Sequence, residues 1–365
     1  MNVLYLINYA GKSGMEKYVE NLTRLLPEAG YHCYFAYNLD GPLAKKMADA
    51  GVESLRLSLE WKDALSAAKR LAAFCREREI EVIHAQGPRE NVIALLARRH
   101  FRELRVVYTS HFTTPCGKAW RLLNHHFTAQ NHCVIAVCKE ARDVLIANGC
   151  RPEKIQVIYN GVEPAPEAPP SDKLRRELGL TEDAFLMCTL ARFDPEKGLD
   201  FLVKAMQRLR EKTQKPFCCA VAGDGPLMED IRAQVHAAGL EQEVRLLGYR
   251  SDAPDILAGS QVYLCSSACN EALSFAILEA MNAGLPPVVT DVGGNRDLAE
   301  TELVCGRVVP YGDVEGFAGA LLELMDDPAE RTALSQAARE KIRLRFDLNK
   351  LALDVAETYQ KENGK

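Results

Sequence analysis

The 365-residue sequence lacks the patterns that mark several classes of protein. It contains no run of about eighteen uninterrupted apolar residues, which a membrane-spanning helix needs. Its first residues have neither the basic stretch nor the small-residue cleavage site of a secretory signal. None of the twelve cysteines belongs to a Cys-x-x-Cys pair, so neither a zinc site nor a thioredoxin-type redox motif is supported. We therefore expect a cytoplasmic protein with reduced thiols and no membrane span.

The charge of the chain is distributed unevenly. Residues 1–165 contain 22 Lys and Arg against 17 Asp and Glu, whereas the remaining residues contain 23 against 33. The net charge of −5 therefore joins a basic half to an acidic half. Such an asymmetry indicates different partners for the two halves.

Short apolar runs alternate along the chain with longer segments of helical period. The segment 15–30 is one such helix candidate, with Gly30 as its expected end. This alternation predicts parallel sheets covered by helices on both faces. The candidate strands are 2–9, 31–38, 53–59, 81–86, 105–111, 133–138, 155–160, 184–193, 216–225, 244–249, 261–267, 286–292 and 303–310.

A proline-rich stretch interrupts this pattern at residues 163–172, where four prolines exclude a continuing helix or a central strand. We interpret it as a linker between two α/β domains, 1–165 and 166–345. The amphipathic tail 346–365 follows the second sheet, and we expect it to pack back on the first domain. Because open α/β sheets bind ligands at the carboxyl ends of their strands, we expect a site in a cleft between the domains.

Residues 270–297 contain two glutamates. Glu271 lies in a predicted loop, and Glu279 lies on the predicted helix that follows and ends at Gly284. The backbone amides of Leu273, Ser274 and Phe275 would stand at the start of that helix and suit an anionic or hydroxyl-rich ligand. Taken individually, the two glutamates are better explained as one that interacts with the helix dipole and one that is solvated.

A second motif, Leu190–Asp200, sets Arg192 and Lys197 five residues apart after a strand. Two fixed cations there would suit the diphosphate of a nucleotide sugar. A capped turn with solvated charges would explain the same residues if they stood alone.

Together these segments resemble retaining glycosyltransferases of the GT-B fold, specifically glycosyltransferase family 4. The shared features are the two glutamates separated by seven residues, the Leu-Glu-Ala-Met sequence that contains Glu279, the Gly293-Gly294 pair and the Arg192/Lys197 pair. The resemblance covers nearly the whole chain. It implies two Rossmann-like, doubly wound domains that face each other across a cleft.

The resemblance extends to four further places. Glycine-containing loops at Gly223 and at Tyr249-Arg250 match those around the nucleotide base, and His111 matches a histidine that contacts the donor sugar. Gly14 and Met15 lie in the loop where the family carries Gly-Gly-x-Glu, but Ser13 replaces the first glycine. A P-loop is excluded there because its full motif is absent.

The resemblance also implies roles for these residues. Arg192 and Lys197 would stabilise the departing diphosphate, Glu271 would bind sugar hydroxyls, and Glu279 the ribose. His111 would contact the sugar near its reacting face. We expect a UDP-sugar, or else a GDP-sugar, and a glycan, lipopolysaccharide or lipid-linked acceptor. We expect no cofactor and no metal, because the two cations replace a metal and no Asp-x-Asp pair ends a strand.

Two alternatives share the fold. A nucleotide-sugar 2-epimerase would isomerise its substrate without an acceptor, and a non-catalytic subunit would bind the nucleotide sugar without transferring it. The combination of Glu271, Glu279, Arg192 and Lys197 argues against both. Nucleic acid is not an expected partner.

Two basic, aromatic-bearing segments, 98–105 and 117–127, lie in the basic half. Each is individually explained as a solvated helix face. Together they support the hypothesis that the first domain approaches an anionic membrane or an anionic acceptor, which would place the protein at the inner face of the cell membrane.

Overall fold

A computed structural model describes residues 1–111, 114–166, 171–269 and 271–360. The chain divides into two compact units. Unit 1 comprises Met1–Asn160 and the segment from Leu348 onward, and unit 2 comprises Gly161–Asp347. The division falls a few residues before the boundary expected at 165. Part of the expected linker, 167–170, lies outside the described residues, as does the end of the tail, 361–365.

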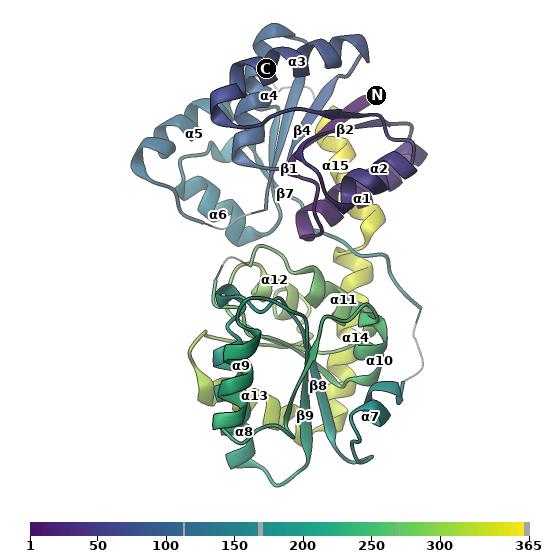
Figure 1. Ribbon diagram of the computed structural model, residues 1–365, viewed down its shortest axis with the longest axis vertical. Coiled ribbons are helices and arrows are strands. Elements are labelled where there is room, and N and C mark those ends of the chain that lie inside the picture. Colours follow the sequence, from purple (N-terminus) through teal and green to yellow (C-terminus); the bar gives the residue numbers. More distant parts are fainter. Residues whose placement is uncertain (112–113, 167–170, 270, 361–365) are drawn as a thin grey trace. The chain divides into compact units, whose positions relative to one another are not determined.

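In the described part of unit 1, seven strands form one parallel sheet in the order β3-β2-β1-β4-β5-β6-β7 (Figure 1). Every neighbouring pair is parallel, as the alternation of strands and helices predicted. The strands are β1 (Asn2–Tyr9), β2 (His32–Leu39), β3 (Ser54–Arg56), β4 (Val82–Ala85), β5 (Arg105–Ser110), β6 (Cys133–Ala136) and β7 (Ile155–Val157).

The helices of unit 1 alternate with these strands. They are α1 (Gly14–Leu25), α2 (Pro42–Asp49), α3 (Ala64–Glu77), α4 (Pro88–His100), α5 (Lys118–Gln130), α6 (Lys139–Ala147) and α15 (Leu348–Gln360), with short 3-10 turns η1 (Leu26–Ala29), η2 (Trp61–Asp63) and η3 (Pro152–Lys154). The helix expected over 15–30 ends earlier, at Leu25, because Pro27 cannot continue it. Gly30 then ends the turn η1 with a left-handed φ of 82°.

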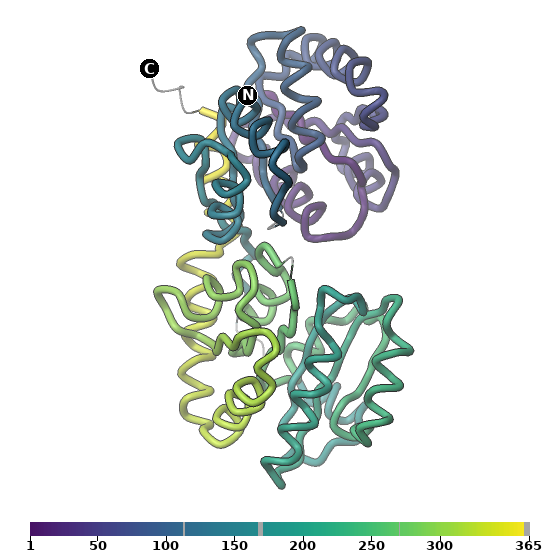
Figure 2. The backbone as a smooth tube through the Cα atoms, turned by 90° about the vertical axis from the view of Figure 1, so that its left-hand side faces the viewer, coloured from purple at the N-terminus to yellow at the C-terminus, as the bar shows by residue number. Residues whose placement is uncertain are grey.

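Helix α15 returns to unit 1 from the far end of the sequence, where Figures 1 and 2 show it in yellow beside purple and blue elements. Alternating side chains of β1 face opposite sides of the sheet. Leu4 and Leu6 pack in the core with α3 and α4, whereas the Tyr5 hydroxyl lies 3.1 Å from the Tyr359 hydroxyl of α15. Helix α15 therefore packs on the face of this sheet opposite to α3 and α4.

In the described part of unit 2, six strands form a parallel sheet in the order β10-β9-β8-β11-β12-β13. They are β8 (Phe185–Leu190), β9 (Phe217–Ala222), β10 (Val244–Gly248), β11 (Val262–Cys265), β12 (Pro287–Thr290) and β13 (Arg307–Val309). The central strands are buried on both faces, which explains their nearly continuous apolar sequences.

Helices cover both faces of this second sheet. In Figure 1, α8 (Leu199–Lys212), α9 (Met228–Ala237) and α13 (Val314–Asp326) lie on one side, and α10 (Ala253–Gly259), α11 (Phe275–Ala283) and α14 (Pro328–Arg345) on the other. The remaining elements are α7 (Lys173–Glu177), η4 (Pro195–Lys197) and α12 (Asn295–Ala299). Across the described residues, no helix combines the length and the apolar character needed to cross a membrane.

Candidate functional site

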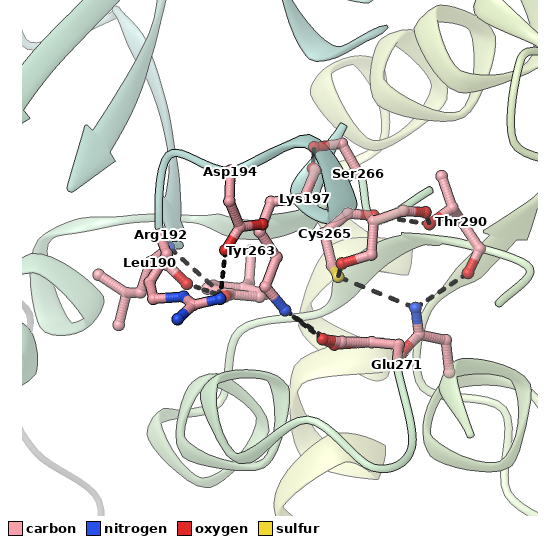
Figure 3. Close-up of polar contacts among 11 residues, drawn as sticks. Leu190, Arg192, Asp194, Lys197, Tyr263, Cys265, Ser266, Glu271 and Thr290 are labelled. Carbon is pink, nitrogen blue, oxygen red and sulfur yellow. Dashed lines mark hydrogen bonds and ion pairs between the residues drawn. The ribbon is translucent and has the colours of Figure 1, made fainter. Parts of the chain in front are cut away.

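The polar centre of unit 2 lies at the carboxyl ends of β8 and β11 (Figure 3). Lys197 ends the turn η4 after β8, and Glu271 lies in the loop after β11. The Lys197 ammonium forms an ion pair with the Glu271 carboxylate, and the second carboxylate oxygen lies 3.2 Å from Nζ. The structure thus brings together two residues that are 74 positions apart in the sequence.

This ion pair is largely shielded from water. The side chains of Lys197 and Glu271 are 27% and 7% exposed. Burial disfavours the ammonium, but the neighbouring Glu271 carboxylate outweighs this effect and raises the pKa of Lys197 above its ordinary value. Lys197 is therefore a fixed cation at neutral pH.

Backbone contacts hold the Lys197 loop against the end of β11. The Ser266 hydroxyl donates to the Lys197 carbonyl at 2.8 Å, and the Ala268 amide donates to the Glu196 carbonyl at 2.7 Å. Gly198 has a left-handed φ of 57°, and a Cβ there would overlap the Ser266 carbonyl. Only glycine allows this close approach without strain.

The Gly-Gly pair fixes the loop that carries Glu271. A Cβ added at Gly293, whose φ is 59°, would overlap the Glu271 carbonyl oxygen. The Gly294 amide donates to the Ala272 carbonyl at 2.8 Å. The two glycines therefore support the position of Glu271.

Arg192 follows β8 on the same loop as Lys197, but it has a different partner. Its guanidinium lies 2.5 Å from the Asp194 carboxylate, and its side chain is 76% exposed. The structure gives each of the two expected cations its own carboxylate. Gly223, at the end of β9, has a φ of 143° and packs against the Ala191 carbonyl just before Arg192.

The helix α11 begins where the sequence predicted. Ser274 is the residue that precedes it, and Gly284 ends it with a left-handed φ of 86°. Leu273 is buried, while Ser274 and Phe275 are half-buried. These residues follow Glu271 directly, so the start of α11 lies beside the ion pair in the chain. Asn270 lies outside the described residues.

Glu279 lies one turn into α11 and is half-buried. It lines a cavity of about 840 Å³ within unit 2, together with Gln261 and Pro286, which directly precede β11 and β12. This cavity therefore opens near the amino ends of those strands. The predicted ribose contact of Glu279 stays a prediction.

Tyr249 and Arg250 follow β10. Tyr249 is 73% exposed, whereas the Arg250 guanidinium is bound to the Glu177 carboxylate at 2.5 Å and to Asp252 at 2.7 Å. This cation holds the pKa of Asp252 well below its usual range. The side chain of Arg250 thus stabilises the fold, which leaves the backbone for the expected contact with the base.

In unit 1, Gly14 and Met15 begin α1, and Ser13 precedes this helix. The Glu16 carboxylate accepts hydrogen bonds from the Ser13 amide at 2.8 Å and from the Gly11 amide at 3.3 Å, and the Ser13 hydroxyl also donates to it. Serine is a favoured residue before a helix. This capping explains why serine is tolerated where the family carries glycine.

His111 follows β5 and is half-buried. Its Nε2 lies 3.0 Å from Gln86 Oε1, and its ring packs edge-on against Tyr18 with 5.1 Å between centroids. Desolvation lowers the pKa of His111 to about 3, so the ring is neutral at pH 7.

A buried network beneath His111 was not expected from the sequence. The ring of His84 is completely buried and bonds the Tyr359 hydroxyl through Nδ1 and the Thr109 hydroxyl through Nε2, each at 2.6 Å. Tyr18, which packs on His111, shares Thr109 as a partner at 3.3 Å. The only signal in the sequence is the presence of polar residues in apolar strands.

Two α/β units, each built on a sheet of parallel strands, make up the GT-B fold. Anabaena HepE, solved in complex with UDP, matches the chain with a TM-score of 0.87 at 22% identity, over 98% of this chain and 99% of that one. The apo lipopolysaccharide outer core galactosyltransferase WaaB matches with a TM-score of 0.78 at 17% identity, over 99% and 100%.

Two family models identify the chain more closely. Residues 12–165 match the model of Glycosyltransferase Family 4, and residues 170–341 match the model of Glycosyl transferases group 1. The chain therefore belongs to the glycosyltransferase family whose two domains these models describe. An Escherichia coli UDP-Gal:alpha-D-GlcNAc-diphosphoundecaprenol alpha-1,3-galactosyltransferase is 26% identical, over 95% of this chain and 93% of its own length. The resemblance to GT-B glycosyltransferases of family 4 is thereby confirmed.

Proposed function

We propose that this glycosyltransferase moves a hexose from a UDP-sugar to a lipid-linked or other glycan acceptor, with retention of anomeric configuration. The observation that carries the proposal is the shielded ion pair between Lys197 and Glu271 at the carboxyl ends of β8 and β11. The choice of UDP rests on the UDP complex of HepE and on the UDP-galactose that the Escherichia coli relative uses.

The ion pair gives each partner a role when the donor binds. The diphosphate carries more negative charge than the Glu271 carboxylate, so the Lys197 ammonium moves to the phosphate oxygens. The Glu271 carboxylate can then accept hydrogen bonds from the hydroxyls of the sugar. In the same way, the Arg192 guanidinium leaves the Asp194 carboxylate and binds the diphosphate. As the bond to the sugar breaks, negative charge grows on the leaving phosphate, and both cations stabilise it.

The acceptor hydroxyl attacks on the face from which the diphosphate leaves, and a phosphate oxygen takes its proton. The new glycosidic bond then has the configuration of the old one. His111 contacts the donor sugar as a neutral ring, which can donate from one nitrogen and accept at the other. No step requires a cofactor or a metal, because Lys197 and Arg192 supply the positive charge.

The other predicted residues bind the donor. Glu279 accepts from the ribose hydroxyls, and the amides of Leu273, Ser274 and Phe275 face its anionic or hydroxyl-bearing groups. Backbone groups at Gly223, Tyr249 and Arg250 surround the base, and those at Gly14 and Met15 face the sugar phosphate.

We also propose that unit 1 touches an anionic membrane through α5. Trp120, Leu122 and Leu123 are 39%, 79% and 45% exposed there, and the cations Lys118 and Arg121 lie on the same helix. The second basic segment contributes less, because Arg98 donates to the Gln130 carbonyl within the fold. Sedimentation with anionic liposomes but not neutral ones is expected; equal partitioning contradicts the contact.

A panel of nucleotide sugars tests the function. We expect UDP-sugars to raise the melting temperature more than GDP- or ADP-sugars, because a ligand that binds the native state stabilises it. With a UDP-sugar and a diphospholipid-linked N-acetylglucosamine acceptor, the NMR coupling constant of the product should report the anomeric configuration of the donor. An inverted product contradicts the mechanism, and an epimerised donor in the absence of acceptor contradicts the function.

A further inference from the structure

Unit 1 contains a cavity of about 620 Å³, whose wall includes Met15 from the residues proposed to bind the donor. This volume lies within the usual range of small-molecule pockets. Its walls come from the ends of β1 and β5 and from α1, α4, α5 and α6. Most of the exposed wall is apolar, contributed by side chains such as Tyr108, Phe127, Val144 and Leu145.

The two tryptophans of the sequence, Trp61 and Trp120, both line this cavity. They come from η2 and α5, and their ring centroids lie 6.1 Å apart. Trp61 is 50% exposed and Trp120 39%, so both rings border the cavity and also meet solvent. Large aromatic rings with this exposure offer apolar area that a ligand would cover.

Several polar side chains in the wall already have partners within the fold. Asn91 and Asn131 exchange amide hydrogen bonds at 2.7 and 3.2 Å. The Asn148 amide donates to Thr114 and accepts from the Cys116 backbone. A sugar ring in the cavity would compete with these hydrogen bonds for its hydroxyls, whereas a hydrocarbon chain would not.

Two nearly buried carboxylates, Glu16 and Glu90, line this wall. Glu16 accepts from the Gly11 and Ser13 amides, and burial raises the pKa of the Glu90 carboxyl above its ordinary value. By contrast, α5 carries Lys118 and Arg121 next to Trp120 and has no acidic residue. An apolar cavity beside two exposed cations suits a ligand with a hydrocarbon chain and a phosphate group.

We propose that this cavity binds the hydrocarbon chain of a lipid-linked acceptor, with Trp61 and Trp120 covering the chain beside its phosphate-bearing end. The proposal rests on the proposed function, since it assigns the acceptor of that reaction to a lipid diphosphate. The two tryptophans are positioned to determine acceptor specificity and take no part in the chemistry.

Intrinsic fluorescence tests the proposal directly, because the protein has no tryptophan outside this wall. Monomeric farnesyl diphosphate should shift the emission to shorter wavelength in a saturable manner, since it displaces water from both rings. Inorganic diphosphate and N-acetylglucosamine should cause no such shift. The variants W61F and W120F each retain one reporter, and each should still respond.

Two substitutions provide the controls. V144F narrows the cavity from a half-buried position and should weaken farnesyl diphosphate binding by at least about tenfold, whereas L353A, at an exposed position on α15, should leave it unchanged. Absence of a saturable shift, an equal shift with N-acetylglucosamine, or equal binding by V144F overturns the proposal.

The thermal shift caused by UDP separates this inference from the proposed function. UDP should raise the melting temperature of V144F as much as that of the unmodified protein. If UDP binds but farnesyl diphosphate does not, the cavity proposal alone fails. If UDP does not bind, the proposed function fails, and the acceptor role of the cavity fails with it.

Discussion

The Lys197–Glu271 pair of unit 2 and the His84–His111 pair of unit 1 differ in charge. In unit 2, the charged pair Lys197 and Glu271 is held between loops that glycines allow to approach closely. In unit 1, His84 and His111 stay neutral, because desolvation lowers the pKa of each to about 3. A charged centre suits a diphosphate, and a neutral one suits hydroxyls and apolar groups.

The two units also differ in the backbone geometry of the loops that follow their strands. The unit 2 loops depend on backbone geometry that only glycine provides, as at Gly198 and Gly293. The corresponding loop of unit 1 accommodates Ser13, whose side chain and amide are bonded to Glu16.

The largest expected effect follows removal of the charged pair. K197A should lower kcat/KM by about 10²–10³, because it removes a cation aimed at the leaving group. It should also destabilise the protein by on the order of 1–3 kcal/mol, since it leaves the Glu271 carboxylate buried without its partner. Steady-state kinetics and urea unfolding measure the two effects.

The variant E271Q is the matched control for this pair. It removes the charge of the carboxylate and leaves Lys197 in place, so UDP binding should survive while transfer of the sugar is impaired. Equal loss of UDP binding in K197A and E271Q would show that the pair is only structural.

The next effect concerns the support of Glu271. G293A should lower both stability and kcat/KM, because its Cβ would displace the Glu271 backbone. Gly239 has a similar φ of 63° but has nothing within 4 Å of its Cβ position. G239A should therefore cost only about 1 kcal/mol and leave activity unchanged. Equal kinetics in the two variants would contradict the supporting role of Gly293.

The neutral network of unit 1 predicts how stability depends on pH. Histidine in an unfolded chain has a pKa of about 6.5, and that of His84 is about 3 in the fold. The unfolded state therefore binds more protons between these values, so the free energy of unfolding falls as pH decreases from about 6.5 toward 3. The maximal slope is about 1.4 kcal/mol per pH unit for one such histidine.

Urea unfolding at a series of pH values measures this slope. The groups that face His84 are Tyr5 from β1, Tyr18 from α1, Tyr359 from α15 and His111. H84Q should flatten the slope, whereas H126Q, at an exposed position on α5, is the matched control. An unchanged slope in H84Q would show that other groups govern the acid sensitivity.

The smallest effect concerns metals. Dialysis against EDTA should leave the transfer rate within about twofold, because the reaction relies on Lys197 and Arg192 for positive charge. A larger loss that Mg²⁺ or Mn²⁺ restores would show that a metal takes part.

Regular patterns in the sequence were sufficient for much of the fold. The two parallel sheets follow from alternating apolar runs and helical periods, and the end of α11 at Gly284 follows from its glycine. The length of α1 was wrong by one turn, because the amphipathic pattern continues past Pro27 while the helix cannot. The spacing of apolar residues indicates which face of a helix is buried. The end of this helix is set by Pro27, which has no backbone N–H to donate.

The site was only partly predictable. Lys197 and Glu271 were identified as separate motifs, but their direct ion pair depends on how β8 and β11 lie side by side in the sheet. The network around His84 and the cavity beside Trp61 and Trp120 join residues from distant parts of the chain. No local spacing in the sequence encodes such contacts.

The binding of UDP, measured by isothermal titration calorimetry, tests the central claim most directly. The unmodified protein and G239A should bind one UDP with equal affinity, and K197A should bind it about 100-fold more weakly, as expected for the loss of a charge-assisted contact. Equal affinity of K197A and the unmodified protein for UDP would contradict the account, because Lys197 would then not hold the diphosphate.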